Sequence, residues 1–267
     1  MSWLWRDELR VLLTPQRVGL QRRARGARSA VVASASTVVD GADAFHWAAA
    51  VEALAALLKA QAKRGADAVV ILSNHFARYT LVPASDLLVT RDDEVRYAQQ
   101  DFVRVYGAAA ERWHVCVSAA NGGGASVASG VDTQLLDALR AVLVAAGLRP
   151  RSLQPALMAA FNTARPRLSG DTLRLLCIEP GMAITALLAP GWQRIRSQRI
   201  GDDSAIDPIV QRERALDAQP LEHETLWVAP VVAGDFAHAL ADGTSVQVLP
   251  PLWADAAEMA ADVERAA

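Results

Sequence analysis

The chain has 267 residues, 52% of them apolar and 21% charged, and its formal net charge is -2. This composition excludes intrinsic disorder, a collagen-like repeat and a disulfide scaffold. At roughly 100 to 200 residues per domain, the length predicts one large domain or two smaller ones. The balanced charge argues against a general nucleic-acid binder.

A local basic cluster is the exception to this balance. We expect it to form the solvated face of a β-hairpin, as isolated basic stripes usually do, with phosphate or lipid binding as the alternative. The cluster comprises Arg17, Arg22, Arg23, Arg25 and Arg28.

The cysteines and the chain start point to a cytoplasmic protein. Cys116 and Cys177 each lie in an apolar run, which predicts two reduced core thiols and no disulfide. Charged residues at positions 6 to 8 interrupt a signal-peptide core before it begins. Every apolar stretch falls short of the roughly 20 residues that a membrane span needs. We therefore expect no export signal and no membrane span.

The first half of the sequence predicts the element order β-β-β-α-β-α-β, interrupted by an insertion. The predicted strands cover 9–13, 17–23, 29–33, 68–72 and 152–157, and the helices 47–64 and 132–146. The insertion, at about 74–130, has strands over 75–82 and 112–118, a helix over 91–107 and a surface loop over 121–126.

The second half predicts the same order without an insertion. Pro180-Gly181 and Pro190-Gly191 suit tight turns, because proline presets φ and glycine accepts positive φ. Strands are expected over 172–178, 182–189, 192–199, 225–229 and 245–249, and helices over 205–216 and 233–241. We therefore expect two halves, at residues 1–164 and 165–267.

This duplicated order resembles the two ribonuclease-H-like halves of the actin and hexokinase superfold, an α/β fold class. The resemblance implies an acidic residue and a glycine-rich turn at the first hairpin of each half, where backbone amides reach nucleotide phosphates. The first hairpin here reads Leu13-Thr14-Pro15-Gln16-Arg17, which has neither the acid nor the glycine. Pro15 also removes one amide donor.

The other two nucleotide loops that the resemblance implies are also degraded. Glu179-Pro180-Gly181 stands where an aspartate and glycine are expected; Glu179 is either a substitute acid or a charged residue beside a β-turn. The paired-glycine turn that approaches adenosine is replaced by a segment whose single glycine, Gly234, comes late. ATP hydrolysis is therefore not expected.

A narrower resemblance rests on the segment 72–83, LSNHFARYTLVP, and on a helix that ends FVRVYG at 102–107. These features resemble the actin-like cytoplasmic proteins of type IV pilus and type II secretion assembly, the PilM and GspL group. GspL-type proteins continue into a membrane helix, and PilM-type proteins carry nucleotide loops. This chain shows neither feature, so the resemblance implies a divergent, nucleotide-free relative.

The resemblance implies a non-catalytic cytoplasmic scaffold, peripheral at the inner membrane, whose partners are inner-membrane pilus or secretion assembly proteins. No cofactor is expected. The alternative is an ATP-binding kinase or ATPase of the same superfold, which would use Glu179 and magnesium.

The candidate site residues follow from this comparison, and none is assigned a catalytic role. Thr14, Asn74, Glu179 and Gly181 are the remnant cleft positions, which a cofactor would occupy under the alternative. Asn74 is either a polar cleft residue or a turn cap, with Arg78 then pairing with a carboxylate such as Glu94.

Trp3 and Trp5 are candidates for partner or membrane contact, or for packing on their own sheet. The five histidines lack metal-ligand spacing, so no metal site is expected.

Overall fold

The computed structural model divides the chain into two compact units, residues 1–77 with 131–156 and 253–267, and residues 78–130 with 157–252. The predicted boundary between residues 164 and 165 concerns the duplicated halves and stays a prediction. The structure describes residues 7–24, 30–39, 46–61, 65–118, 124–167, 172–189, 191–201, 205–217, 224–234, 236 and 239–254.

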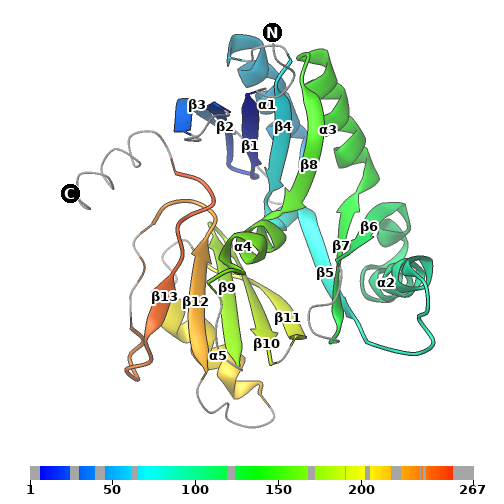
Figure 1. Ribbon diagram of the computed structural model, residues 1–267, viewed down its shortest axis with the longest axis vertical. Coiled ribbons are helices and arrows are strands. Elements are labelled where there is room, and N and C mark those ends of the chain that lie inside the picture. The colour runs from blue at the N-terminus through cyan, green and yellow to red at the C-terminus, as the bar shows by residue number, and fades with distance from the viewer. Residues whose placement is uncertain are drawn as a thin grey trace. The chain divides into compact units, whose positions relative to one another are not determined.

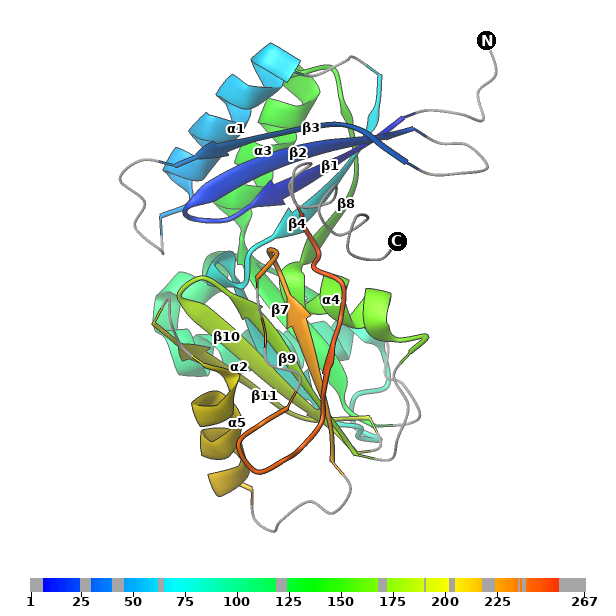
Figure 2. The same ribbon diagram turned by 90° about the vertical axis from the view of Figure 1, so that its left-hand side faces the viewer.

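The first unit is built on a five-stranded sheet with the order β3-β2-β1-β4-β8 (Figure 1). Its first three strands are antiparallel, and β4 and β8 run parallel to β1. Figure 2 shows α1 and α3 together on one face of the sheet. The elements are β1 (Glu8–Leu13), β2 (Arg17–Ala24), β3 (Ala30–Val38), α1 (Ala48–Gln61), β4 (Asp67–Leu72), η1 (Asn74–Phe76), α3 (Thr133–Ala145) and β8 (Arg149–Pro155).

The core of the first unit lies between the sheet and these two helices. The spacing of Leu135, Leu139 and Leu143 places one buried residue on each turn of α3, and Leu54 and Leu58 do the same on α1. Asp132 caps α3 by accepting a hydrogen bond from the Gln134 N–H, as its position before the apolar periodicity predicts.

Part of the opposite face of this sheet is covered by the segment around Trp253. The indole is buried, and a Cβ atom added to Gly19 on β2 would lie 2.3 Å from its Cζ2 atom. Gln21 Nε2, two residues along β2, donates a 2.6 Å hydrogen bond to the Ala254 carbonyl oxygen. Glycine at position 19 is therefore required by the close approach of the indole.

The second unit contains another five-stranded sheet, with the order β11-β10-β9-β12-β13. The helix α5 packs on it through Ile206, Ile209 and Val210, which join Leu226 and Val228 in one apolar cluster. The elements are α4 (Ala156–Ala164), β9 (Leu173–Glu179), β10 (Met182–Leu188), β11 (Trp192–Arg199), α5 (Ile206–Ala215), β12 (Thr225–Pro230) and β13 (Val246–Val248).

The predicted helix over 233–241 is wrong. The described residues of that segment form no helix, and Ala239 instead makes an antiparallel bridge with Ser245. The Leu240 N–H donates to the Thr244 carbonyl, and the Gly243 N–H donates to the Leu240 carbonyl. Gly243 has a φ of 81°. The Asp242-Gly243 turn signal and burial of Leu240 outweigh the helical preference of the alanines.

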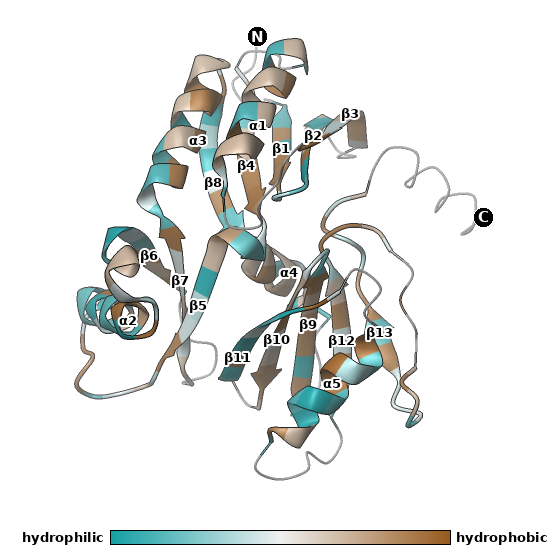
Figure 3. Ribbon diagram, turned by 180° about the vertical axis from the view of Figure 1, so that it is seen from behind, coloured by the Kyte–Doolittle hydropathy of each residue, from teal (hydrophilic) through white to brown (hydrophobic). Residues whose placement is uncertain are grey.

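The inserted segment forms a three-stranded sheet with the order β5-β7-β6, and α2 packs on it (Figure 3). Thr90 and Asp93 form a capping box at the start of α2. The strand β7 was not predicted from the sequence. The elements are β5 (Ala77–Val82), α2 (Arg91–Tyr106), η2 (Gly107–Arg112), β6 (Trp113–Val117) and β7 (Ser126–Asp132).

The strand β7 is inconspicuous because it contains small residues and Gly130. A Cβ atom at Gly130 would lie 2.9 Å from the Trp113 ring and 3.1 Å from the Phe102 ring. These two rings pack edge to face with centroids 5.6 Å apart. The glycine therefore makes room for an aromatic cluster between β7 and α2, which a β-propensity scale does not register.

The prediction of two core thiols is correct for Cys177 and wrong for Cys116. Both are free, but Cys116 is exposed. The two-residue period of β6 directs Val115 and Val117 inward, so His114 and Cys116 face outward.

A buried ion network lies at the start of β9. The Arg174 side chain is fully buried, and its Nη2 atom donates to Asp217 at 2.8 Å and to Glu224 at 2.7 Å. Asp217 also pairs with Arg194, and Glu224 with Arg214. Burial lowers the pKa of Arg174, but the hydrogen bonds and charges of Glu224 and Asp217 outweigh that effect and raise it.

Candidate functional site

The candidate site positions lie at the carboxyl ends of β1, β4 and β9, the usual ligand edge of α/β sheets. Thr14 and Asn74 belong to the first unit, whereas Glu179 and Gly181 belong to the second. Leu13 pairs with Leu72 in the parallel β1–β4 ladder, so the chain leaves both strands at the same edge, with Thr14 next after β1. Trp3 and Trp5 lie outside the described residues.

The two hairpin turns at these edges have the same construction. Thr14-Pro15-Gln16-Arg17 and Glu179-Pro180-Gly181-Met182 both place proline at the first corner. The outer residues of each turn face one another, as shown by the 3.0 Å bond from Thr14 N–H to Arg17 O and by the Glu179–Met182 register. Thr14 and Glu179 are therefore equivalent positions of the duplicated sheets.

Backbone hydrogen bonds around the turns repeat as well. The Gln16 carbonyl accepts from Val39 N–H at 2.9 Å, and the Gly181 carbonyl accepts from Ile200 N–H at 3.2 Å. Both donors follow the third strand of their sheet. A second pair of bonds repeats too: the Leu13 carbonyl accepts from the Ser73 N–H at 2.9 Å, and the Ile178 carbonyl accepts from the Val231 N–H at 2.8 Å. The turns are therefore built into the sheets on both sides.

At the first turn, the Thr14 side chain is used to close the turn. Its hydroxyl donates to the Arg17 carbonyl at 2.9 Å and accepts from the Arg17 N–H at 2.9 Å. Because Thr14 is only 5% exposed, this hydroxyl serves a local structural purpose. Pro15 supplies no N–H at the corner, as the sequence predicts.

At the second turn, Gly181 has a φ of 77°, which suits the second corner of a turn that begins with proline. Glu179 is 3% exposed and ends the fully buried strand β9. Its carboxylate therefore sits in a desolvated environment at the edge of the sheet.

Tyr79 is the neighbour of Glu179 that sequence reasoning missed. Burial raises the pKa of the Tyr79 phenol well above its ordinary value, and the nearby Cys177 and Glu179 raise it further. A hydrogen bond with the Leu157 backbone, at the start of α4, acts in the opposite direction. The phenol therefore stays protonated and neutral at neutral pH, beside the end of β9. No local pattern in β5 marks this contact.

The raised pKa of Tyr79 predicts a loss of stability at alkaline pH. The unfolded chain ionises this phenol near pH ~10, whereas the folded protein resists ionisation. The contribution is complete below that pH and is lost as pH rises toward the folded-state pKa. We expect ultraviolet titration to show one tyrosine transition displaced to high pH, absent in Tyr79→Phe and retained in Tyr97→Phe. A displaced transition that persists in Tyr79→Phe would contradict the assignment.

Arg78, the residue before Tyr79, lies under an aromatic ring of α2. Its guanidinium carbon is 5.9 Å from the centroid of the Tyr106 ring. The pKa of Arg78 is lowered, mainly because the side chain is buried. The nearby Arg199 also lowers this pKa, whereas Tyr106 and Tyr79 raise it. Glu94, the example of a carboxylate that Arg78 would pair with under the turn-cap alternative, forms an ion pair with Arg91 at 2.9 Å.

Asn74 is 1% exposed in the η1 turn after β4. The side chain that caps this turn belongs to Ser73, whose hydroxyl accepts a 3.1 Å hydrogen bond from the His75 N–H. Of the two alternatives for Asn74, the turn cap is therefore wrong by one residue, because the capping position precedes the turn.

Metal-ligand and membrane-spanning signatures are both missing from the described part of the chain. There, no three His, Cys, Asp or Glu side chains gather closely enough to hold a metal ion. No helix within the same residues combines the length and apolar character that crossing a bilayer requires.

Comparison with known proteins identifies the fold. No family model and no curated protein sequence matches the chain. The cytoplasmic domain of EpsL, an inner membrane component of the type II secretion system of Vibrio cholerae, matches it with a TM-score of 0.59 and 15% identity, over 91% of this chain and 89% of that one.

Two further solved structures match at similar levels. One belongs to a PilM-PilN type IV pilus biogenesis complex, with a TM-score of 0.63 and 14% identity over 93% of this chain and 90% of that chain. The other is a Bacteroides thetaiotaomicron protein of unknown function with an actin-like ATPase fold, with a TM-score of 0.58 and 10% identity over 97% and 96%. The resemblance drawn from the sequence is confirmed at the level of the fold: the protein has an α/β, actin-like fold.

Proposed function

We propose that this protein is a non-catalytic cytoplasmic scaffold of a type IV pilus or type II secretion assembly, which acts through protein contacts at the inner membrane. The observation that carries the proposal is the construction of the two equivalent hairpin turns. In each, a proline occupies the corner where a nucleotide-binding turn would offer a backbone N–H to a phosphate. The Thr14 hydroxyl, moreover, is bonded within its own turn.

The likeness to EpsL and PilM supports the assignment to this kind of assembly. It extends over about nine-tenths of each chain compared. EpsL is described as an inner membrane component of its secretion system, and PilM occurs in a complex with PilN. By analogy, the partners proposed here are inner-membrane assembly proteins that present segments to the cytoplasm.

Thermal unfolding with and without millimolar Mg-ATP tests the non-catalytic part of the proposal. A ligand at about 100 times its dissociation constant stabilises the folded state by roughly 2.7 kcal/mol, which shifts the melting temperature by several degrees. We expect no shift. A shift that Glu179→Gln abolishes, without loss of the basal melting transition, would instead establish the ATP-binding alternative.

Defined partner segments test the scaffold part. The purified protein should be titrated with the cytoplasmic segments of the inner-membrane pilus and secretion proteins of its source organism, each made as a labelled peptide or domain. We expect saturable binding of at least one segment, measured by fluorescence anisotropy. Failure of every segment would contradict the proposed function.

A further inference from the structure

The strand β3 is an edge strand without the usual protection against pairing. Among the described residues it pairs only with β2, and its nine residues, AVVASASTV, include no charge and no proline. Val32 and Val38 on this strand are 48% and 67% exposed. Natural edge strands commonly carry charged side chains or prolines, because an open row of N–H and C=O groups invites another strand.

The equivalent edge strand of the second sheet provides an internal comparison. It is β11, the third strand of its sheet as β3 is of the first. Its eight residues, WQRIRSQR, include Arg194, Arg196 and Arg199. One copy of the duplicated fold therefore has a charged edge, whereas the other has an edge of small, neutral side chains.

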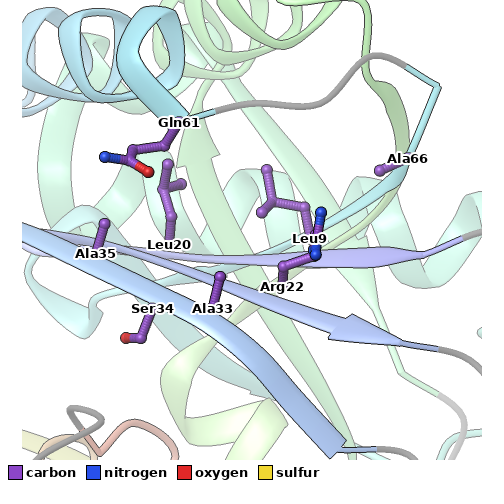
Figure 4. A pocket seen from close by; sticks show the side chains of 8 residues that line it. All are labelled: Leu9, Leu20, Arg22, Ala33, Ser34, Ala35, Gln61 and Ala66. Atoms are coloured by element: carbon purple, nitrogen blue, oxygen red, sulfur yellow. The ribbon is translucent and has the colours of Figure 1, made fainter.

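A cavity opens beside the neutral edge, on the face of the sheet that carries α1. Its volume is about 230 Å³, and it is lined by Leu9, Leu20, Arg22, Ala33, Ser34, Ala35, Gln61 and Ala66. Figure 4 shows Leu9 and Leu20 pointing from the sheet toward α1, with Gln61 at the end of that helix. The Ser34 side chain points to the opposite face, as strand alternation requires.

Arg22 is the charged residue of this cavity, and it does not form the solvated hairpin face that the sequence predicts. It is half-buried, and its Nε atom is buried without a hydrogen-bond acceptor among the described residues. A carboxylate oxygen of Asp7 lies 3.6 Å away, an ion pair beyond good hydrogen-bonding distance. A buried guanidinium nitrogen in this state favours an incoming acceptor.

The strand register aligns the cavity with the open edge. Arg22 pairs with Ala33, and Leu20 pairs with Ala35, so each larger side chain is separated from the edge by an alanine. A strand added to β3 would lie two strand spacings, roughly 9.6 Å, from β2. A glutamate opposite Ala33 could extend over the alanine methyl to Arg22, while an aliphatic side chain opposite Ala35 could reach Leu20.

We propose that β3 and this cavity form a docking site for an extended peptide segment, which adds to the sheet as a sixth strand and places a glutamate against Arg22. Backbone hydrogen bonds supply affinity, and the cavity supplies specificity for an acidic and an aliphatic residue two positions apart. The inference deepens the proposed scaffold function by naming a surface and a class of partner segment, and it rests on that function.

Two synthetic peptides test the site, fluorescein-labelled Ser-Thr-Ile-Thr-Glu-Thr-Ser and Ser-Thr-Glu-Thr-Ile-Thr-Ser, both amidated. The two peptides differ in whether isoleucine precedes or follows glutamate. We expect only one of them to bind, and its residue order reports whether the added strand is antiparallel or parallel to β3. Replacing its glutamate with lysine should weaken binding by at least about tenfold, since a charge-assisted hydrogen bond is lost and two cations meet. N-methylation should be made at either alternate set of backbone nitrogens, because only every second N–H of an added strand faces β3. Binding should be abolished when the methylated nitrogens are those that face β3, because the ladder cannot form, and retained when they face solvent.

Protein variants complete the test by fluorescence anisotropy. Arg22→Gln should weaken the glutamate peptide about tenfold, and Ala33→Leu, which blocks the path to Arg22, should do the same. Arg196→Gln, on the edge strand of the other sheet, is the matched control and should bind normally. The melting temperature of each variant shows that it is folded, and Ala33→Leu provides a second measurement if Arg22→Gln is unstable.

Several results would overturn the docking site. They are no binding of either peptide at millimolar concentration, equal binding of the lysine peptide, or binding that survives N-methylation of each alternate set of nitrogens. Dimers in light scattering that Val32→Lys abolishes would assign the edge to a second copy of the chain. If a natural segment binds wild type and Arg22→Gln equally, the scaffold function stands and only this site is wrong.

Discussion

Replacing Arg174 with methionine is expected to lower the free energy of unfolding by about 3–5 kcal/mol, the usual cost of removing one partner from a buried ion pair. The Arg174 side chain is fully buried, and the side chains of Asp217 and Glu224 are only 5% and 4% exposed. Without the guanidinium, two buried carboxylates face each other. Arg194 and Arg214 still contact them, but from positions that are partly solvated.

Urea unfolding measures this effect, and two further variants test its cause. Arg174→Met combined with Glu224→Gln should recover part of the loss, because one uncompensated charge is removed. Arg140→Met is the matched surface control: Arg140 lies 3.8 Å from Asp137, and both side chains are mostly exposed. Arg140→Met should lower the free energy of unfolding by less than about 1 kcal/mol. Equal costs at the two arginines would contradict the buried-network interpretation.

Replacing Trp253 with alanine is expected to cost about 3–5 kcal/mol, as for other buried tryptophans. The side chain is 1% exposed and lies directly over Gly19. Gly19→Ala should also destabilise the protein, because the new methyl would lie 2.3 Å from the indole and the ring must move.

A double-mutant cycle distinguishes this contact from a general effect of either substitution. In the Trp253→Ala background, Gly19→Ala should cost nothing or stabilise slightly, because alanine loses less backbone entropy on folding than glycine. Urea unfolding of the four proteins gives the coupling. Additive costs would show that the indole does not determine the need for glycine at position 19.

Local sequence patterns predict much of this fold. The proline-containing turns, the amphipathic helices and the alternating strands are local features, because each depends on residues close in the chain. The failures are equally specific. The helix expected over 233–241 is replaced by a bridge between Ala239 and Ser245, where tertiary burial of Leu240 competes with local propensity.

The candidate site was predictable only in part. The equivalence of Thr14 and Glu179 follows from the duplicated order, since both begin the hairpin turn that joins the first two strands of a sheet. Their surroundings do not follow from that order. Tyr79 contributes to the environment of Glu179 across about a hundred residues of sequence, and Arg22 lines a cavity that also requires α1 and β3.

The sequence by itself determines that this protein has two sheets of the same strand pattern and that proline occupies the first hairpin turn of each sheet. These properties depend on backbone stereochemistry and hydrophobic period, which act over a few residues. Only the tertiary structure decides that Trp253 covers Gly19, that Tyr79 lies near Glu179, and that Arg22 lies beside an open strand edge. Such contacts depend on which distant side chains fill the same space, and no local pattern records them.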